Sequence, residues 1–232
     1  MIKAVFFDLY QTLVYYRPSQ AELEAEALGK LGFRTTAEAL NRPILTANEF
    51  IYRQMAKRPL SQRSREEVAA LYTEYQRVVL KEVGINAEEK VVLKLLGMMQ
   101  QAKMDIVLFA DVLPALDNIK GRGLVTGLIS NIEKDMTAAI EKLGLSSKLD
   151  IIVTSQDAGV AKPQPEIFQY ALRQGNVQPA ESIYIGDQYQ VDVLGSNAAG
   201  MKGILLDRVG YYQEKLDCPV IKSLTELPGF IK

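Results

Sequence analysis

The sequence contains no histidine, and Cys218 is its single cysteine. One cysteine cannot form an internal disulfide. The lack of histidine excludes zinc sites built from Cys and His ligands and also excludes catalysis by a histidine base. Any chemistry must therefore use carboxylates, lysine, hydroxyl groups or a metal ion bound through oxygen.

An excess of charge of one sign is also missing. The 27 Lys and Arg residues and the 28 Asp and Glu residues leave a net charge of −1, and no long basic run occurs. A nucleic-acid-binding surface concentrates positive charge. The expected partner is therefore a small molecule and not a nucleic acid, and the sequence carries no signal for an oligomeric state.

Apolar runs long enough to span a membrane are absent as well, so no membrane partner is expected. Met1 leads directly into the first predicted strand, which leaves no room for a signal peptide, and a cytoplasmic location is the expectation. With 232 residues, of which 48% are hydrophobic, the chain can build one large core or two smaller ones.

The stretch Ala4–Leu13, which reads AVFFDLYQTL, is the most informative in the chain. Four apolar residues lead into Asp8 without alternation, as is typical of a strand buried on both faces of a parallel sheet. Asp8 then falls at the carboxyl end of that strand, where open α/β sheets bind their ligands. Taken alone, an aspartate that merely opens a turn is the simpler alternative.

Helical periodicity dominates from about Pro18 to Gln101. Capping-box patterns predict four helix starts there, at Ser19 with Glu22, Thr35 with Glu38, Ser64 with Glu67, and Asn86 with Glu89. The charge-rich segment 53–67 is expected to be a solvated turn between two helices, and attraction of an anionic substrate by its basic residues is the alternative.

Strand and helix patterns alternate from Asp105 onward. Further strands are predicted at 124–129, 151–154, 183–185 and 203–206, with a short one at 219–221. A helix after the first of these carries Met136, Ala139, Ile140 and Leu143 and ends at Gly144. Strands separated by helices predict right-handed crossovers and a doubly wound parallel sheet.

The first strand is separated from the others by the long helical segment, which is therefore predicted to be an insertion. The expected fold is α/β, with a doubly wound, Rossmann-like parallel-sheet core made from residues 1–14 and 105–232. Residues 15–104 are expected to form a helical cap over the crevice at the carboxyl edge of the sheet.

Polar residues follow three of the predicted strands. Asp8 follows the first, Ser130 and Asn131 the second, and Asp187 the one at 183–185. Asp192 lies five residues beyond Asp187, in the first turn of a helix expected to begin near position 189. Helix capping and dipole interactions explain each of these residues singly. Their shared position at one sheet edge favours an active site instead.

A lysine joins this set from the loop 159–163, where Pro163 biases Lys162 toward extended geometry. If Asp8, Asp187 and Asp192 converge, each pair of charges at ~4 Å costs about 4 kcal/mol at an effective dielectric near 20. A bound cation relieves this repulsion, and Mg²⁺ suits an all-oxygen ligand set that is shared with a phosphate.

These residues fall into four short motifs. In chain order they are Asp8-Leu9-Tyr10-Gln11-Thr12, Ser130-Asn131, Lys162-Pro163 with Pro165 and Phe168, and Gly186-Asp187-Gln188-Tyr189-Gln190-Val191-Asp192 with Gly195 and Gly200-Met201. In order and spacing they resemble the motifs of the haloacid dehalogenase superfamily of hydrolases, and the resemblance covers the whole chain. The helical insertion after the first motif resembles the helical cap of that superfamily.

The resemblance implies a role for each catalytic candidate. Asp8 would be the nucleophile, and Thr12 would orient it. Ser130 and the backbone at Asn131 would hold the transferred group of the substrate, and Lys162 would neutralise its charge.

The resemblance also implies a magnesium site. Asp8, Asp187 and Asp192 would contribute carboxylates, and Tyr10 would contribute its backbone carbonyl.

Tyr10 departs from the pattern of the phosphatases, which usually carry a general-acid aspartate at this place. A tyrosine here resembles the metal-free 2-haloacid dehalogenases. That branch typically has Ser and Asn where this chain has Asp187 and Tyr189, and a Tyr where it has Phe168.

Three functions therefore stay open. The first choice is a Mg²⁺-dependent phosphohydrolase with an aspartyl-phosphate on Asp8, favouring good leaving groups. A 2-haloacid dehalogenase that forms an ester on Asp8 is the alternative. A catalytically weak protein that binds a metabolite or a protein partner is the third.

Overall fold

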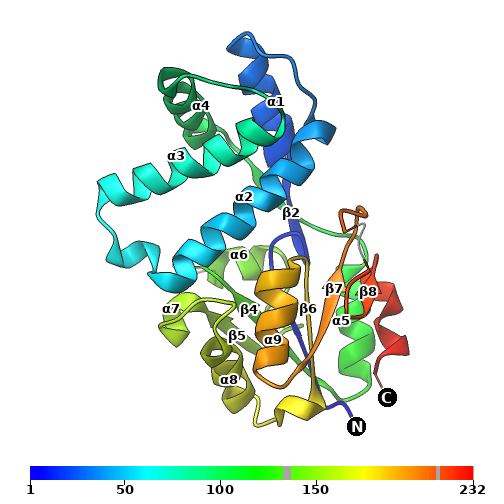
Figure 1. Cartoon of the computed structure of the whole chain (residues 1–232). Helices are drawn as coiled ribbons and strands as arrows, with labels where there is room; N and C mark the ends of the chain where they lie inside the picture. The colour runs from blue at the N-terminus through cyan, green and yellow to red at the C-terminus, as the bar shows by residue number, and fades with distance from the viewer. Residues whose placement is uncertain (133–136, 213–214, 232) are drawn as a thin grey trace. The chain divides into compact units, whose positions relative to one another are not determined.

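The computed structural model describes residues 1–132, 137–212 and 215–231. The chain divides into two compact units (Figure 1). One consists of Met1–Tyr15 and Val107–Lys232 and is an α/β core, and the other, Tyr16–Ile106, is mainly helical. No helix in the described ranges is long and apolar enough to cross a membrane.

A six-stranded parallel sheet forms the centre of the core, in the order β5-β4-β1-β6-β7-β8. The strands are β1 (Ala4–Phe7), β4 (Val125–Ser130), β5 (Ile151–Thr154), β6 (Ser182–Gly186), β7 (Lys202–Leu206) and β8 (Val220–Ile221). The chain runs outward from β1 through β4 to β5 and then returns to β6 on the other side of β1. The order thus reverses at β1, and in such sheets the ligand crevice lies at the carboxyl ends beside this point.

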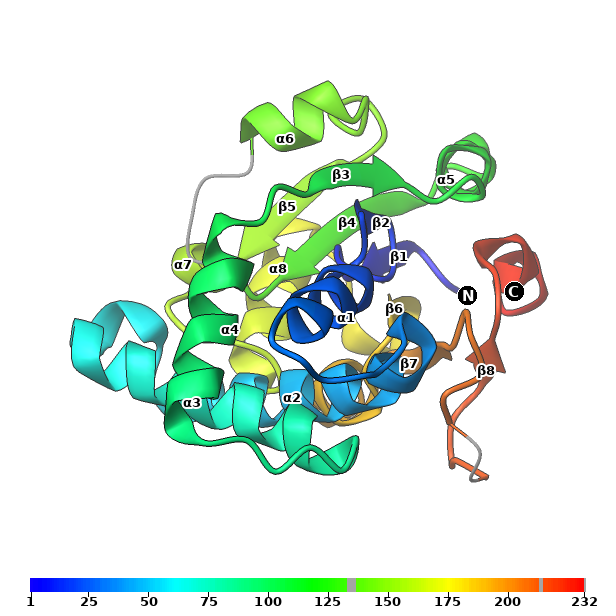
Figure 2. The same ribbon diagram turned by 90° about the horizontal axis from the view of Figure 1, so that it is seen from above.

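Helices cover both faces of the sheet, which confirms the predicted doubly wound α/β fold. Figure 2 shows α5 (Val112–Gly121) and α6 (Thr137–Lys142) on one face, and α8 (Pro165–Gln174) and α9 (Leu194–Ala198) on the other. A short helix, α7 (Ser155–Ala158), precedes α8. Met136, which the sequence assigned to the helix now seen as α6, lies outside the described residues.

The buried strands explain one glycine that strand propensity disfavours. All four residues of β1 are fully buried, and Phe6 lies opposite Gly127 of β4. A Cβ atom at Gly127 would lie 2.3 Å from the Phe6 ring. Glycine is therefore required where the two backbones leave room for an aromatic ring.

Two short strands were not predicted from the sequence. β2 (Val14–Arg17) and β3 (Asp105–Leu108) pair with each other in a separate two-stranded sheet. With four residues each and only partial burial, neither strand has enough apolar positions to show a strand period. The two crossings of the chain between the units fall within these strands.

Four helices build the helical unit. They are α1 (Gln20–Lys30), α2 (Ala37–Lys57), α3 (Arg65–Glu82) and α4 (Glu89–Gln101). α1 contacts α2 and α4, and α3 contacts the same two helices, so the bundle closes on itself. Its core includes the fully buried side chains of Leu28, Leu40, Val79 and Leu95.

Two of the four predicted helix starts are correct. Ser19 with Glu22 and Ser64 with Glu67 form complete capping boxes. At α2 the prediction is wrong by one residue, because Thr36 and not Thr35 accepts from the backbone of Ala39.

The predicted cap of α4 is wrong. The helix begins at Glu89 with Glu88 at the N-cap, and no side chain caps it. Asn86 lies two residues before that cap position, so its spacing to Glu89 only resembles a capping box.

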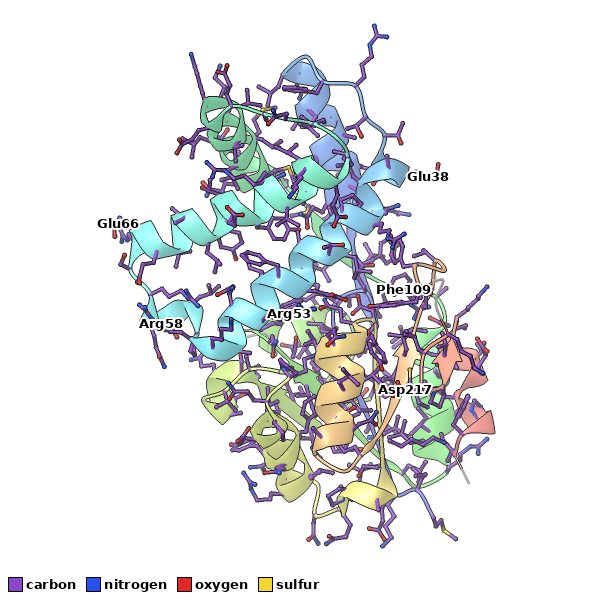
Figure 3. The ribbon with its side chains drawn as sticks, viewed as in Figure 1. Glu38, Arg53, Arg58, Glu66, Phe109 and Asp217 are labelled. Carbon is purple, nitrogen blue, oxygen red and sulfur yellow. The ribbon has the colours of Figure 1, made fainter. Side chains whose placement is uncertain are left out.

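The solvated turn expected at 53–67 is shorter than predicted. α2 continues to Lys57 because Ile51 and Met55, one helical turn apart, are both buried. Two basic residues of the remaining turn have structural partners. Arg58, which is labelled in Figure 3, forms an ion pair with Glu67 at 2.6 Å. Arg63 donates to two backbone carbonyls. This engagement counts against the anion-attracting alternative.

A carboxyl group lies inside the helical unit. Glu24 is fully buried and accepts from the amides of Gln20 at 2.8 Å and Gln76 at 3.1 Å. Gln20 also donates to the hydroxyl of Tyr75, which in turn donates to Asn48. Burial raises the pKa of Glu24, although both amide hydrogen bonds oppose the shift.

We predict that Glu24 makes the stability of the helical unit depend on pH. Its raised pKa means that the folded state binds more protons than the unfolded state, so stability is fully present below the usual glutamate pKa, 4.5, and falls as pH rises through the folded-state value. Urea unfolding followed by helical circular dichroism should show this slope in the wild type and a flatter one in Glu24→Gln. The exposed Glu74→Gln is the control and should keep the wild-type slope. Equal slopes in all three proteins would contradict the prediction.

Candidate active site

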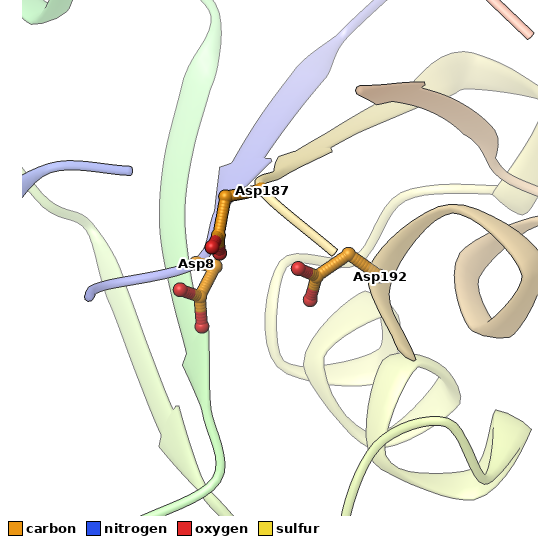
Figure 4. Close-up of side chains that lie close together, drawn as sticks. All are labelled: Asp8, Asp187 and Asp192. Carbon is orange, nitrogen blue, oxygen red and sulfur yellow. The ribbon is translucent and has the colours of Figure 1, made fainter. Parts of the chain in front are cut away.

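Three carboxylates meet at the carboxyl edge of the sheet, as Figure 4 shows. Asp8 follows β1 and Asp187 follows the neighbouring strand β6, and the backbone N–H of Asp8 donates to Ile185 at 2.8 Å. Asp192 comes from the turn after β6. One oxygen of each carboxylate lies within 4.8 Å of the other two.

Lys162 brings a positive charge into this cluster. Its Nζ atom donates to Asp8 Oδ1 at 2.6 Å, to Asp192 Oδ1 at 2.7 Å and to the hydroxyl of Tyr184 at 2.8 Å. Only 3% of the lysine side chain is exposed. Its three N–H donors thus have three partners, and the site still carries two more negative charges than positive ones when every carboxylate is ionised.

The pKa values reflect burial and this imbalance of charge. Burial raises the pKa of Asp8 to about 6, although Lys162 opposes the shift. Burial, followed by the charges of Asp192 and Asp8, raises the pKa of Asp187 well above its usual range. Burial alone would lower the pKa of Lys162, but Asp192 and Asp8 outweigh it and the pKa rises.

The donor set fits a hard divalent cation. Carboxylate oxygens are the preferred ligands of Mg²⁺ and Ca²⁺, and two positive charges would balance the cluster. The Oγ1 atom of Thr12, in the adjoining loop, is buried and has no hydrogen-bond partner in the described part of the chain. Such a group is available to a bound ligand or to the nucleophile.

The turn that carries Asp192 differs from the expected helix. Residues Tyr189–Val193 form a π-type turn before α9 begins at Leu194. The backbone N–H of Gln188 donates to Asp192 Oδ2 at 3.0 Å, so this carboxylate closes its own turn with one oxygen while the other faces Lys162. π-type turns interrupt regular helices and are frequent at functional sites.

The second motif, Ser130-Asn131, lies at the end of β4 and also positions Lys162. The side-chain amide of Asn131 donates to the backbone carbonyl of Lys162 at 2.9 Å and accepts from its backbone N–H at 2.7 Å. Ser130 is the last residue of β4 and is buried next to β1. The two residues expected to hold a substrate group thus lie at the same edge, and Asn131 additionally locks the backbone of Lys162.

The loop after Asp8 is a tight turn. Gln11 has a left-handed backbone with φ of 62°, and its N–H donates to Val14 at 2.7 Å. Left-handed geometry is uncommon outside glycine and often marks functional sites. Tyr10 and Thr12 flank Gln11, so both predicted residues of the first motif belong to this constrained loop.

Tyr184 is a site residue that the sequence did not reveal. It lies in β6, is fully buried, and its hydroxyl contacts Lys162 and the carbonyl of Ile129 at 3.1 Å. Its ring packs edge-to-face on Phe168. A single polar tip inside an otherwise apolar strand, Ile183-Tyr184-Ile185, was the available signal.

The fold and the site define a class of α/β protein with a cluster of carboxylates at the carboxyl edge of a parallel sheet. The family model of haloacid dehalogenase-like hydrolases matches residues 2–200, and the chain belongs to this family.

Two relatives differ in how much of the chain they cover. Glyceraldehyde 3-phosphate phosphatase of Methanothermobacter thermautotrophicus is 30% identical over an alignment of 238 positions, which covers 98% of each protein. Haloacid dehalogenase-like hydrolase domain-containing protein 3 of Danio rerio is 36% identical over 124 residues, or 52% of this chain. The match spans about half of that relative, 51%.

Solved structures of two kinds share the fold. The L-2-haloacid dehalogenase RSc1362 superimposes with a TM-score of 0.68 at 22% identity, covering 99% of this chain and 98% of that one. The HAD-hydrolase YfnB of Bacillus subtilis, bound to magnesium, gives 0.65 at 18% identity with the same coverage. Identities this low establish the fold and do not separate the two activities.

We predict that Gly186→Ala damages the site by displacing Asp192. A Cβ atom at Gly186 would lie 2.3 Å from the carboxylate of Asp192, which would have to leave Lys162. Breaking a buried ion pair costs about 3–5 kcal/mol, and chemical denaturation should show a loss of this order. The control is Gly29→Ala, whose Cβ meets nothing within 4 Å. It should leave stability unchanged or raise it by about 0.4–1 kcal/mol. Equal stability of the two variants would show that Asp192 tolerates the methyl group.

Proposed function

We propose that this chain is a Mg²⁺-dependent phosphohydrolase that acts on a small anionic phosphate ester through an aspartyl-phosphate on Asp8. The observation that carries the proposal is the contact of one buried lysine with Asp8 and Asp192, beside the uncompensated carboxylate of Asp187. The relative from Methanothermobacter, named a glyceraldehyde 3-phosphate phosphatase, supports phosphate esters as the substrate class.

The metal would be held by residues of two loops. Asp8 and the backbone carbonyl of Tyr10 come from the first, and Asp187 and Asp192 come from the second. Asp187 is the strongest candidate, because the oxygens of Asp192 already accept from Lys162 and Gln188. When bound, Mg²⁺ would offset the charge of the phosphate oxygens and of the acidic cluster.

Asp8 is placed to act as the nucleophile. Lys162 engages its Oδ1 atom, so Oδ2 is the oxygen assigned to the attack on phosphorus. The new bond joins Asp8 Oδ2 to phosphorus while the bond from phosphorus to the ester oxygen breaks, and the departing alcohol takes up a proton. Water then attacks phosphorus, which releases inorganic phosphate and restores the carboxylate.

The remaining residues hold the transferred group. Lys162 contributes positive charge at the oxygen of Asp8, while Ser130 and the backbone N–H of Asn131 provide donors at the end of β4. Such preorganised donors stabilise developing charge most strongly where water is excluded. Thr12, with its buried Oγ1 atom lacking a partner in the described residues, is assigned to orient the nucleophile.

A 2-haloacid dehalogenase is the second candidate, and Tyr10 is the observation that favours it. The same carboxylate oxygen would attack carbon and expel halide. Asp187 argues against this reading, since a metal-free site gains nothing from an additional, half-buried negative charge beside its nucleophile.

We expect Mg²⁺ to stabilise the wild type, because it binds the folded cluster and not the unfolded chain. At 100 times Kd the gain is about 2.7 kcal/mol, readable as a rise in Tm, and Asp187→Asn should lose most of it. Asp8→Asn should fold and lose all turnover.

The same proteins should be assayed with p-nitrophenyl phosphate, acetyl phosphate, glyceraldehyde 3-phosphate and 2-chloropropionate, each with Mg²⁺ or with EDTA. Phosphate release that requires Mg²⁺ supports the proposal. Chloride release that is unaffected by EDTA, without phosphate release, would establish the dehalogenase instead.

Tyr10 sets the expected preference among phosphate esters. A general acid contributes roughly 10²–10⁴-fold, mainly when the leaving oxygen is basic, and tyrosine is a far weaker acid than a carboxyl group. Acyl and aryl phosphates should therefore react much faster than alkyl phosphates such as glyceraldehyde 3-phosphate. Tyr10→Asp should raise kcat for the alkyl ester about 10²-fold and leave the acyl phosphate nearly unchanged. Equal wild-type rates, with no gain in the variant, would mean that another group protonates the leaving oxygen.

A further inference from the structure

The connection between β7 and β8 contains none of the four motifs. It nevertheless contacts the loop that follows Asp8 and the loop that carries Asp187. Asp207 follows β7 at the carboxyl edge of the sheet, and its N–H donates to Ile221 at 2.8 Å. It is 5% exposed, and its carboxylate accepts from the backbone N–H groups of Tyr211 at 2.9 Å and Tyr212 at 3.1 Å. This buried carboxylate thereby fixes the turn that presents Tyr212.

Tyr212 reaches the loop of Asp187. Its hydroxyl accepts from the backbone N–H of Tyr189 at 3.1 Å and donates to the backbone carbonyl of Asp187 at 3.4 Å. These two groups enclose Gln188, whose own N–H is held by Asp192. Asp192 and Tyr212 thus hold the N–H and the carbonyl of the same peptide group, the one between Asp187 and Gln188, and Tyr212 also holds the N–H of the next peptide group. Tyr189 adds a hydrogen bond from its hydroxyl to Asp217 of the same connection.

Arg208 reaches the loop of Asp8. Its guanidinium donates to the backbone carbonyl of Thr12 at 2.8 Å and to both oxygens of Asp111 at 2.9 and 3.0 Å. It also stacks on the ring of Phe109 at 3.9 Å, and Figure 3 labels Phe109 and Asp217. Asp111 is itself held by the hydroxyl of Ser223 at 2.8 Å. A planar fork with several fixed partners holds a carbonyl in one place, which a lysine cannot match.

We propose that Arg208 and Tyr212 are positioning residues for the reaction. Arg208 fixes the loop that carries the nucleophile and Thr12, and Tyr212 fixes the loop that carries Asp187. Arg208 holds the backbone carbonyl of Thr12, and Tyr212 holds that of Asp187. A small displacement of either carbonyl would therefore move the side chain of a site residue. The inference rests on the proposed phosphohydrolase function and adds residues to that same site.

Tyr212→Phe tests the second contact, because it removes only the hydroxyl. We expect the apparent Mg²⁺ affinity, from the dependence of Tm on Mg²⁺ concentration, to fall roughly three- to tenfold, the range of one hydrogen bond. Tyr170→Phe on α8 is the matched control and should keep the wild-type affinity. A Tyr212→Phe protein with wild-type Mg²⁺ affinity and wild-type kcat would overturn the role of Tyr212.

Arg208→Lys tests the first contact while keeping a positive charge beside Asp111. We expect kcat to fall on the order of tenfold or more, because misplacement of reacting groups is costly, with KM within about twofold if substrate binding is kept. Arg122→Lys, at the residue that follows α5, is the control and should keep the wild-type kcat. A purely structural role would lower Tm without Mg²⁺ but leave kcat and Mg²⁺ affinity unchanged, and that result would overturn the role of Arg208.

Failure of the inference and failure of the proposed function give different results. A wild type without Mg²⁺-dependent phosphate release refutes the function, whatever the variants do. An active wild type whose Arg208→Lys and Tyr212→Phe variants match it in kcat and Mg²⁺ affinity refutes only the inference. Should Arg208→Lys fail to fold, Tyr212→Phe still decides whether the connection between β7 and β8 positions the site.

Discussion

The hydrogen bonds of the buried Lys162 ammonium group hold together the cluster at the carboxyl edge of the sheet. The Nζ atom lies between 2.6 and 2.8 Å from Asp8, Asp192 and Tyr184. A charge removed from water costs several kcal/mol unless it is paired and fully hydrogen-bonded, so all three acceptors have to be present together. They come from the end of β1, which Asp8 directly follows, from β6 and from the turn after β6. The side chain of Lys162, whose backbone is held by Asn131, therefore ties the ends of adjacent strands into a single arrangement.

The site is nevertheless left electrostatically incomplete. Lys162 offsets only part of the negative charge, and Asp187 stands beside two carboxylates with its pKa raised by burial and by their charges. Stability alone does not account for such a group, since an unpaired charge is costly even when it is only half-buried. A divalent cation would remove this repulsion, because its two positive charges equal the excess negative charge of the cluster.

The sequence predicts this edge better than it predicts what supports it. The strands, and the convergence of Asp8, Asp187 and Lys162, could be predicted from the sequence. Parallel strands end at one edge of a sheet, and each of these residues directly follows a strand or precedes a proline. β2 and β3 were missed because four half-buried residues show no period. The contact of Arg208 with the loop of Asp8 could not be predicted, for another reason. Arg208 contacts Thr12 across 196 residues of sequence, and no local pattern encodes a pairing over such a separation.

Tyr184 shows that a residue outside the expected motif position can supply the same functional group to the site. Phe168 stands in the motif that begins at Lys162, at the position where the dehalogenase pattern has a tyrosine, and it lacks a hydroxyl. In the structure its ring packs edge-to-face on Tyr184 with centroids 5.0 Å apart, and it is Tyr184, from β6, that places a hydroxyl 2.8 Å from the lysine. The buried aromatic pair thus combines an apolar ring with a polar tip that needs a partner. Because the hydroxyl near Lys162 comes from β6 and not from α8, which carries Phe168, the lack of a hydroxyl at one motif position does not establish that its contact is absent from the site.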